Sequence, residues 1–117
     1  MALEPCPSSP NCISTQADPA DTRHYMAPIE LSSPPDDVLD VVQAVLEETS
    51  GAEVAHRTAD HIDAVFTTRI FRFKDDVSFT VEGGKLHFRS ASRLGHSDLG
   101  ANRKRMTALL PQIEAKL

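Results

Sequence analysis

A predicted β-hairpin is the feature that most constrains how this chain folds. Residues 77–82 and 85–90 alternate between apolar and polar side chains, and only Gly83-Gly84 separates them. A two-residue Gly-Gly loop favours a tight primed turn and so fixes the strand register, which places Phe79 opposite Phe88. Alternation then predicts four core side chains, which are Phe79, Val81, Leu86 and Phe88. The remaining side chains form a predicted polar face on the other side of the sheet, consisting of Ser78, Thr80, His87 and Arg89.

Two more strands and a helix are predicted before this hairpin. Residues 53–59 and 62–71 are predicted strands, and residues 62–71 are rich in β-branched and aromatic residues. The preceding helix has Ser33 as its expected N-cap and Pro34 at its first position, and Gly51 is expected to end it. Valines at helical spacing predict its buried side, and they are Val38, Val41, Val42 and Val45.

A second helix is predicted to begin near Ser97 or Asp98, because both residue types are good N-caps. Its expected apolar stripe consists of Leu99, Met106, Leu109, Leu110, Ile113 and Leu117. Pro111 is expected to kink or interrupt it. The order therefore predicts an α+β fold made of a helix, a four-stranded antiparallel meander and a helix, with both helices on one sheet face.

The N-terminal segment has a different composition. Seven of the eight prolines precede residue 36, so residues 1–35 are expected to form an extended or turning arm. The whole chain of 117 residues fits one compact domain. We therefore expect a Pro-rich arm, residues 1–35, packed on a single α+β domain, residues 36–117.

Nothing in the sequence predicts a membrane segment or a secretory leader. No stretch approaches 18 consecutive apolar residues, and Met1–Cys12 lacks both a basic region and an apolar run. We therefore expect a soluble protein that is cytoplasmic as encoded, or periplasmic or lumenal if a leader was removed before this numbering begins.

Charge is distributed unevenly along the chain, which has a net charge of −5. Residues 1–65 hold twelve acidic and two basic residues, whereas residues 66–105 hold nine basic and four acidic ones. The two parts are expected to attract each other in the folded domain. With one Tyr and no Trp, the chain has little with which to stack on bases, and we expect no nucleic-acid partner.

The basic segment 89–105 contains the candidate binding site. Arginine binds planar anions through paired hydrogen bonds, and the start of the second helix offers free backbone donors. The candidate ligand-binding residues are Arg89, Ser90, Ser92, Arg93, Asp98, Asn102 and Arg103. An internal network of arginines and aspartates that ties the last strand to the second helix would explain the same residues.

Three segments of the chain together carry a resemblance to a known family. They are Cys6–Ala17, Phe66–Val77 and Arg89–Arg105. The chain resembles the domain-of-unknown-function family 1499, which is found in bacteria and plastids, over nearly its whole length. The resemblance implies no established activity, substrate or cofactor.

Cys6 and Cys12 are a candidate disulfide pair, with five residues between them. We expect a bridge in an oxidising compartment and free thiols in a reducing one. No zinc or other metal site is predicted, because the chain lacks a second pair of ligands, although His24 could add one ligand. No cofactor is predicted either.

Three classes of function remain open. The first is a binding domain for a small anionic ligand or a partner's carboxylate, at the site named above. The second is a small hydrolase or transferase in which His87 or His96 acts as a base. The run His96-Ser97-Asp98 is no catalytic triad, because adjacent residues rarely orient toward one another in the required geometry. The third is a structural accessory protein whose motifs fasten the arm to the domain.

Overall fold

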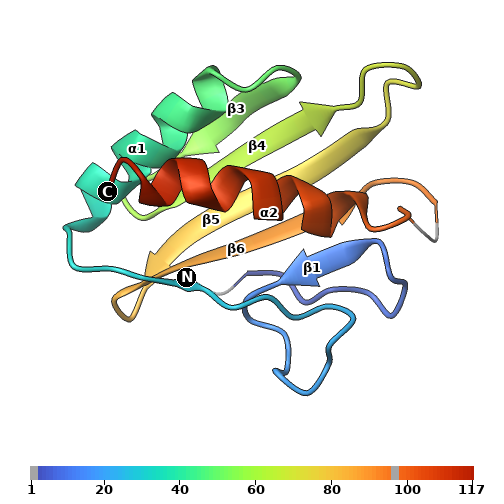
Figure 1. The fold of residues 1–117 in the computed structure, drawn as a ribbon, viewed down its shortest axis with the longest axis horizontal. Helices are drawn as coiled ribbons and strands as arrows, with labels where there is room; N and C mark the ends of the chain where they lie inside the picture. Colours follow the sequence, from blue (N-terminus) through green and yellow to red (C-terminus); the bar gives the residue numbers. More distant parts are fainter. Residues whose placement is uncertain (1–2, 96–97) are drawn as a thin grey trace.

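The computed structural model describes residues 3–95 and 98–117, and these form two helices and a sheet of six strands (Figure 1). The elements are β1 (Cys12–Ser14), β2 (Ile29–Glu30), α1 (Pro35–Glu47), β3 (Ala52–Arg57), β4 (His61–Thr67), β5 (Lys74–Glu82), β6 (Lys85–Ser92) and α2 (Ala101–Glu114). The predicted α+β class is confirmed. The sheet differs from the predicted four strands because the N-terminal segment adds β1 and β2.

Strands β3 to β6 pair in sequence order, and every pair is antiparallel. The predicted hairpin register is confirmed, with Phe79 opposite Phe88. Gly83 and Gly84 both have positive φ, as a primed turn requires. Strand β6 is also the partner of both short strands, since Cys12 of β1 lies opposite Ala91 and Ile29 of β2 opposite Leu86. The N-terminal segment therefore extends the sheet along β6.

Strand β4 ends at Thr67, so the predicted strand over 62–71 was too long. The backbone N–H of Thr68 donates to the carbonyl of Phe73, and the N–H of Phe73 donates to Thr68 Oγ1, both at 2.8 Å. These bonds close a four-residue tip over residues 69–72. Closure of this turn outweighs the β propensity of its apolar residues.

Helix α1 begins at Pro35, and its N-cap is Pro34 rather than the predicted Ser33. The structure shows no side-chain cap there. Gly51 does not end the helix, which stops at Glu47, but lies in the following turn with φ +83°. A Cβ at this position would lie 2.8 Å from the carbonyl oxygen of Thr67, so both backbone conformation and close approach favour glycine.

Helix α2 begins at Ala101, three residues later than Asp98, and Ser97 lies outside the described residues. Leu99 and Gly100 have positive φ, which a right-handed helix excludes. The helix continues through Pro111 to Glu114, so the predicted interruption does not occur. Leu99 and Leu117 are exposed and do not belong to the apolar stripe.

A single hydrophobic core lies between the helices and one face of the sheet. Both helices cross this face in Figure 1. The core includes buried residues from α1, α2 and the central strands, among them Val38, Leu39, Val42, Ile62, Phe79, Leu86, Phe88, Met106 and Ile113. The opposite face of β4, β5 and β6 carries polar side chains, among them His61, Asp63, Ser78 and Arg89.

Candidate functional site

Strand β6 divides the predicted anion site between the two faces of the sheet. Ser90 and Ser92 point toward α2, where both hydrogen-bond to Asn102. Arg89 leaves the strand on the opposite side, because side chains alternate along a strand, and Arg93, just after the end of β6, lines the same pocket as Arg89. The structure therefore does not bring the seven candidate residues together around one ligand.

A buried polar cluster joins the helix side of the sheet to α2. Its centre is Arg105, which was not among the candidate residues. Arg105 donates to Asp75 Oδ2 at 2.5 Å, to Asn102 Oδ1 at 2.8 Å and to Ser90 Oγ at 3.1 Å. Its guanidinium carbon also lies 4.8 Å from the centroid of the Phe66 ring, in cation–π geometry. These contacts connect strands β4, β5 and β6 to the helix.

Asn102 and Asp98 complete this cluster at the start of α2. Asn102 is fully buried, and its Nδ2 donates to Ser92 Oγ, to the carbonyl of Asn11 and to Asp98 Oδ2. Asp98 also accepts the backbone N–H groups of Gly100 and Asn102. Burial opposes ionisation of Asp98, but these hydrogen bonds lower its pKa below the usual range. Four of the candidate residues are thus bonded within the protein.

Arg103 has a different set of partners. Its Nη2 donates to the carbonyl oxygens of Thr22, Arg23 and Tyr25, at 3.1 to 3.2 Å. These bonds connect the N-terminal segment to α2. Arg103 is therefore placed to hold that segment rather than to meet an anion beside Arg89.

The other face of the sheet carries a pocket of about 450 Å³. Strands β4, β5 and β6 form most of it, and Leu3 and Glu4 of the N-terminal segment contribute to its lining. Its polar residues are Glu4, His61, Asp63, Asp76, Ser78, Arg89 and Arg93. Of the seven candidate residues, Arg89 and Arg93 line this pocket.

Three pocket residues form a hydrogen-bonded chain. Ser78 Oγ donates to Asp63 Oδ1 at 2.7 Å, and His61 Nε2 lies 2.8 Å from the same oxygen. Burial opposes ionisation of Asp63, but the hydrogen bonds from Ser78 and His61 lower its pKa. Because an ionised carboxylate only accepts hydrogen bonds, His61 carries its proton on Nε2. The other ring nitrogen, Nδ1, has no hydrogen-bond partner among the described residues.

The two arginines of the pocket differ in their pairing. Arg93 forms a two-pronged ion pair with Asp76, with distances of 3.0 and 2.9 Å. Arg89 is half-buried, and its Nη2 makes a single long hydrogen bond of 3.4 Å to the carbonyl of Pro5. Across the described parts of the chain, two buried side-chain polar atoms lack a hydrogen-bond partner, and they are Arg89 Nε and His61 Nδ1. Both residues line the same pocket.

The two histidines considered as bases lie elsewhere. His87 Nδ1 is hydrogen-bonded to Thr15 Oγ1 at 2.8 Å, so its ring meets the N-terminal segment. Burial lowers the pKa of His87, which favours its neutral form. His96 lies outside the described residues. The histidine that lines the pocket is His61, which the sequence did not single out.

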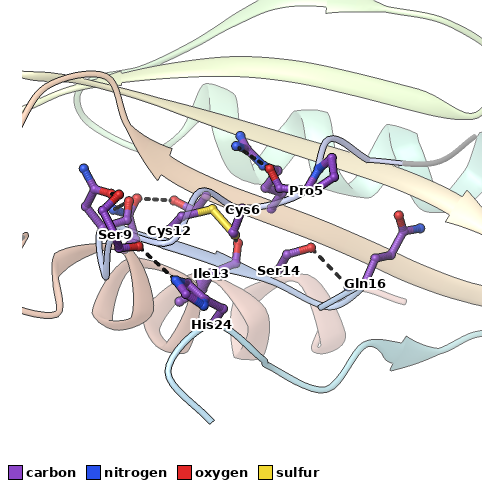
Figure 2. The surroundings of a disulfide bond; sticks show 12 residues. Pro5, Cys6, Ser9, Cys12, Ile13, Ser14, Gln16 and His24 are labelled. Atoms are coloured by element: carbon purple, nitrogen blue, oxygen red, sulfur yellow. Dashed lines mark hydrogen bonds between the residues drawn. A yellow bond between two sulfur atoms is a disulfide. The ribbon is translucent and has the colours of Figure 1, made fainter. Parts of the chain in front are cut away.

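The predicted Cys6–Cys12 disulfide is present, and it holds the start of the chain against β1 (Figure 2). Nearby, His24 bonds the carbonyl of Ser9 at 2.9 Å and Asp21 Oδ2 at 2.6 Å. The Ser9 carbonyl, followed by Asp21, raises the pKa of His24. Both ring nitrogens of His24 are thus engaged. Residues 3–95 and 98–117 contain no group of three His, Cys, Asp or Glu side chains suited to a metal ion.

These features define a small α+β domain in which a disulfide-tied N-terminal segment borders a polar pocket on the sheet. The family model described as "Protein of unknown function (DUF1499)" matches residues 2–113. The chain therefore belongs to this family, and the resemblance seen in the sequence is confirmed. No curated protein matches the chain. Within the described residues, no helix is both long and apolar enough to cross a membrane.

Proposed function

We propose that this protein binds a small anionic ligand, a carboxylate or a phosphate compound, in the pocket on the sheet face opposite the helices. Arg89 would be the charge partner of the anion. The proposal rests on the polar atoms of the pocket residues that have no hydrogen-bond partner. The two buried polar side-chain atoms without a partner among the described residues belong to Arg89 and His61, and both residues line it.

The other arginines of segment 89–105 already have partners within the protein. Arg93 is paired with Asp76, Arg105 with Asp75, and Arg103 bonds three backbone carbonyls. Leaving a buried donor unsatisfied costs about 1–3 kcal/mol, so such groups call for an explanation. A ligand oxygen beside the Arg89 guanidinium would supply the missing partner, with a small local shift that opens Nε to the pocket.

Two of the three acidic residues that line the pocket, Asp63 and Asp76, are already engaged by other side chains. Asp63 already accepts hydrogen bonds from Ser78 and His61, and Asp76 is held by Arg93. Asp76 is therefore neutralised by an ion pair and Asp63 is engaged by two hydrogen bonds, whereas the charge of Arg89 is not matched by an ion pair in the described structure. A carboxylate or phosphate could bond the guanidinium through two oxygens.

A thermal-shift screen tests this proposal. Phosphate, nucleotides, carboxylic acids and sugar phosphates are added to the wild type, to Arg89→Gln and to Arg57→Gln. Arg57 is a matched control because its guanidinium bonds Asp40 and Gln43 on α1, away from the pocket. A ligand at a hundredfold excess over its Kd adds about 2.7 kcal/mol of stability, which raises the melting temperature by roughly ten degrees.

The expected result is a shift in the wild type and in Arg57→Gln that is lost in Arg89→Gln. An unchanged shift in Arg89→Gln would contradict the role of Arg89. The absence of a shift with every compound would contradict an anion site of this kind. In that case the arginines of this chain are better explained as residues that stabilise the fold through internal ion pairs and hydrogen bonds.

Catalysis in the same pocket is the second candidate function, and one observation favours it. Asp63 holds His61 Nε2 and leaves the buried Nδ1 without a partner, so a small local shift that opens Nδ1 to the pocket would make this nitrogen available as a general base. This moves the predicted hydrolase or transferase base from His87 or His96 to His61. Incubating identified ligands with the wild type and with His61→Gln, followed by mass analysis, tests it. Turnover that His61→Gln retains would contradict this role.

A further inference from the structure

Exposed apolar side chains gather at one end of the molecule. The β4–β5 connection and the β6–α2 connection both lie at this end, to the right in Figure 1. Five large apolar residues on these connections are more than half exposed, and they are Ile70 (82%), Phe71 (73%), Phe73 (53%), Leu94 (76%) and Leu99 (87%). Single exposed apolar residues are ordinary, but a contiguous group of them indicates a site of interaction.

These residues form one surface rather than separate protrusions. Phe71 and Phe73 from the first connection and Leu94 and Leu99 from the second line a common hollow of about 550 Å³. The rings of Phe71 and Phe73 stack, with their centroids 5.5 Å apart. We refer to residues 69–73, Leu94 and Leu99 as the apolar end.

The tip of the apolar end has a defined conformation. The two hydrogen bonds between Thr68 and Phe73 close the turn beneath residues 69–72. Arg72 has a positive φ of 58°, a conformation that residues other than glycine, asparagine and aspartate seldom adopt. The closed turn thus holds Ile70 and Phe71 away from the core, where side chains of their kind are usually buried.

The charge of this end is opposite to that of the whole chain. The chain has a net charge of −5, yet residues 66–74 contain Arg69, Arg72 and Lys74 and no acidic residue. All three cations are exposed. The nearest acidic residues along the chain, Asp75 and Asp76, are paired with arginines of their own. The four residues of the tip, Arg69 to Arg72, are therefore basic, apolar, apolar and basic in order.

From this arrangement we propose that the apolar end docks on a phospholipid bilayer whose surface carries anionic headgroups. Ile70 and Phe71 enter the interfacial layer, and Arg69 and Arg72 contact lipid phosphates on either side of them. Basic residues near an anionic surface and apolar side chains in the interface strengthen binding together. A protein partner would need acidic side chains at the positions that face Arg69 and Arg72. An anionic bilayer presents negative headgroups over its whole surface, so both arginines find a negative group in any orientation of the tip. This proposal does not depend on the pocket at Arg89.

Vesicle flotation tests the proposal with purified full-length protein. The vesicles contain phosphatidylcholine alone, or phosphatidylcholine mixed with phosphatidylglycerol. The test variants are the double substitutions Ile70→Ser/Phe71→Ser and Arg69→Glu/Arg72→Glu. The matched controls change an exposed apolar residue and two lysines elsewhere on the molecule, of which Lys116 is exposed and Lys85 is partly exposed, and they are Leu117→Ser and Lys85→Glu/Lys116→Glu.

We expect the wild type to float with the anionic vesicles and not with the neutral ones, and salt to weaken this binding. Loss of Ile70 and Phe71 should weaken binding by more than about tenfold, because each side chain loses its apolar burial. Each basic residue near an anionic surface contributes roughly fivefold, so reversal of Arg69 and Arg72 should weaken binding by at least about 25-fold. Both controls should bind as the wild type does.

Three results would overturn the proposal. One is a wild type that floats with neither vesicle, and another is binding that both test variants retain. The third is a wild-type dimer in sedimentation that Ile70→Ser/Phe71→Ser converts to monomer, because this end would then cover a second copy of the chain. The substituted side chains are exposed, so the variants should melt with the wild type. Should one fail to fold, the other variant and the salt titration decide the question.

Discussion

At the scale of single residues, two ion pairs on adjacent aspartates differ in how much they should contribute to stability. The Arg105–Asp75 pair is buried, with side chains 13% and 5% exposed, whereas the Arg93–Asp76 pair is about half exposed. Arg105→Met leaves the Asp75 carboxylate buried without its partner and should cost about 3–5 kcal/mol. Arg93→Met should cost no more than about 1 kcal/mol. Urea unfolding measures both, and equal costs would contradict the assigned roles.

His24 provides a second prediction at this scale. Its pKa is raised in the folded protein by the Ser9 carbonyl and by Asp21. The protonated ring therefore stabilises the fold fully below the unfolded pKa of about 6.5, and this contribution is lost as pH rises through the higher folded pKa. In urea unfolding between about pH 6 and pH 8, the wild type should lose more stability than His24→Gln. A pH dependence that His24→Gln leaves unchanged would show that His24 is not its source.

The residue scale also shows where prediction from sequence was limited. Arg89 and Ser90 are neighbours in sequence, and the predicted strand already implied that they leave it on opposite sides. The candidate set was chosen by residue type, so it combined residues from both faces of the sheet. The alternation of side chains along the strand could have separated them. The partnership of Arg105 with Asp75 was harder to foresee, because 30 positions separate the two residues and only the sheet register brings them together.

At the scale of elements, local interactions determined what could be predicted. The hairpin register follows from two glycines and the alternation beside them, and it is confirmed. Strands β1 and β2 escaped prediction because they have three and two residues and exist through pairing with the distant β6. The start of α2 was misplaced because its N-cap is Gly100, while Asp98 accepts the N–H of Asn102 from before the turn at Leu99 and Gly100.

Two glycines test how the connections constrain the sheet. Gly51 and Gly84 both have positive φ, and for alanine this conformation costs about 1–2 kcal/mol. At Gly84 a Cβ meets nothing within 4 Å, but at Gly51 it would lie 2.8 Å from a backbone oxygen of Thr67. Gly51→Ala should therefore destabilise the protein clearly more than Gly84→Ala in urea unfolding. Equal effects would mean that the β3–β4 end of the sheet relaxes freely.

At the scale of the whole molecule, the disulfide should contribute both to the stability of the fold and to the geometry of the pocket. The Cys6–Cys12 bridge closes a short loop, which on the chain-entropy model contributes about 2 kcal/mol. The same bridge ties down the residues just after Leu3 and Glu4, which line the pocket, and the Pro5 carbonyl that Arg89 contacts. Cys6→Ser/Cys12→Ser should therefore lower both the free energy of unfolding and the affinity for any ligand held at Arg89.

The two effects can be measured separately. Urea unfolding of the double serine variant gives the loss of stability, and titration of an identified ligand into the folded variant gives the loss of affinity. Deleting residues 1–5 provides the matched comparison, because it removes the pocket border and leaves the Cys6–Cys12 bridge in place. If the N-terminal segment borders the site, both changes weaken binding, but only the serine variant loses the stability that the bridge contributes. Unchanged affinity in both would show that the segment fastens the sheet edge without taking part in binding.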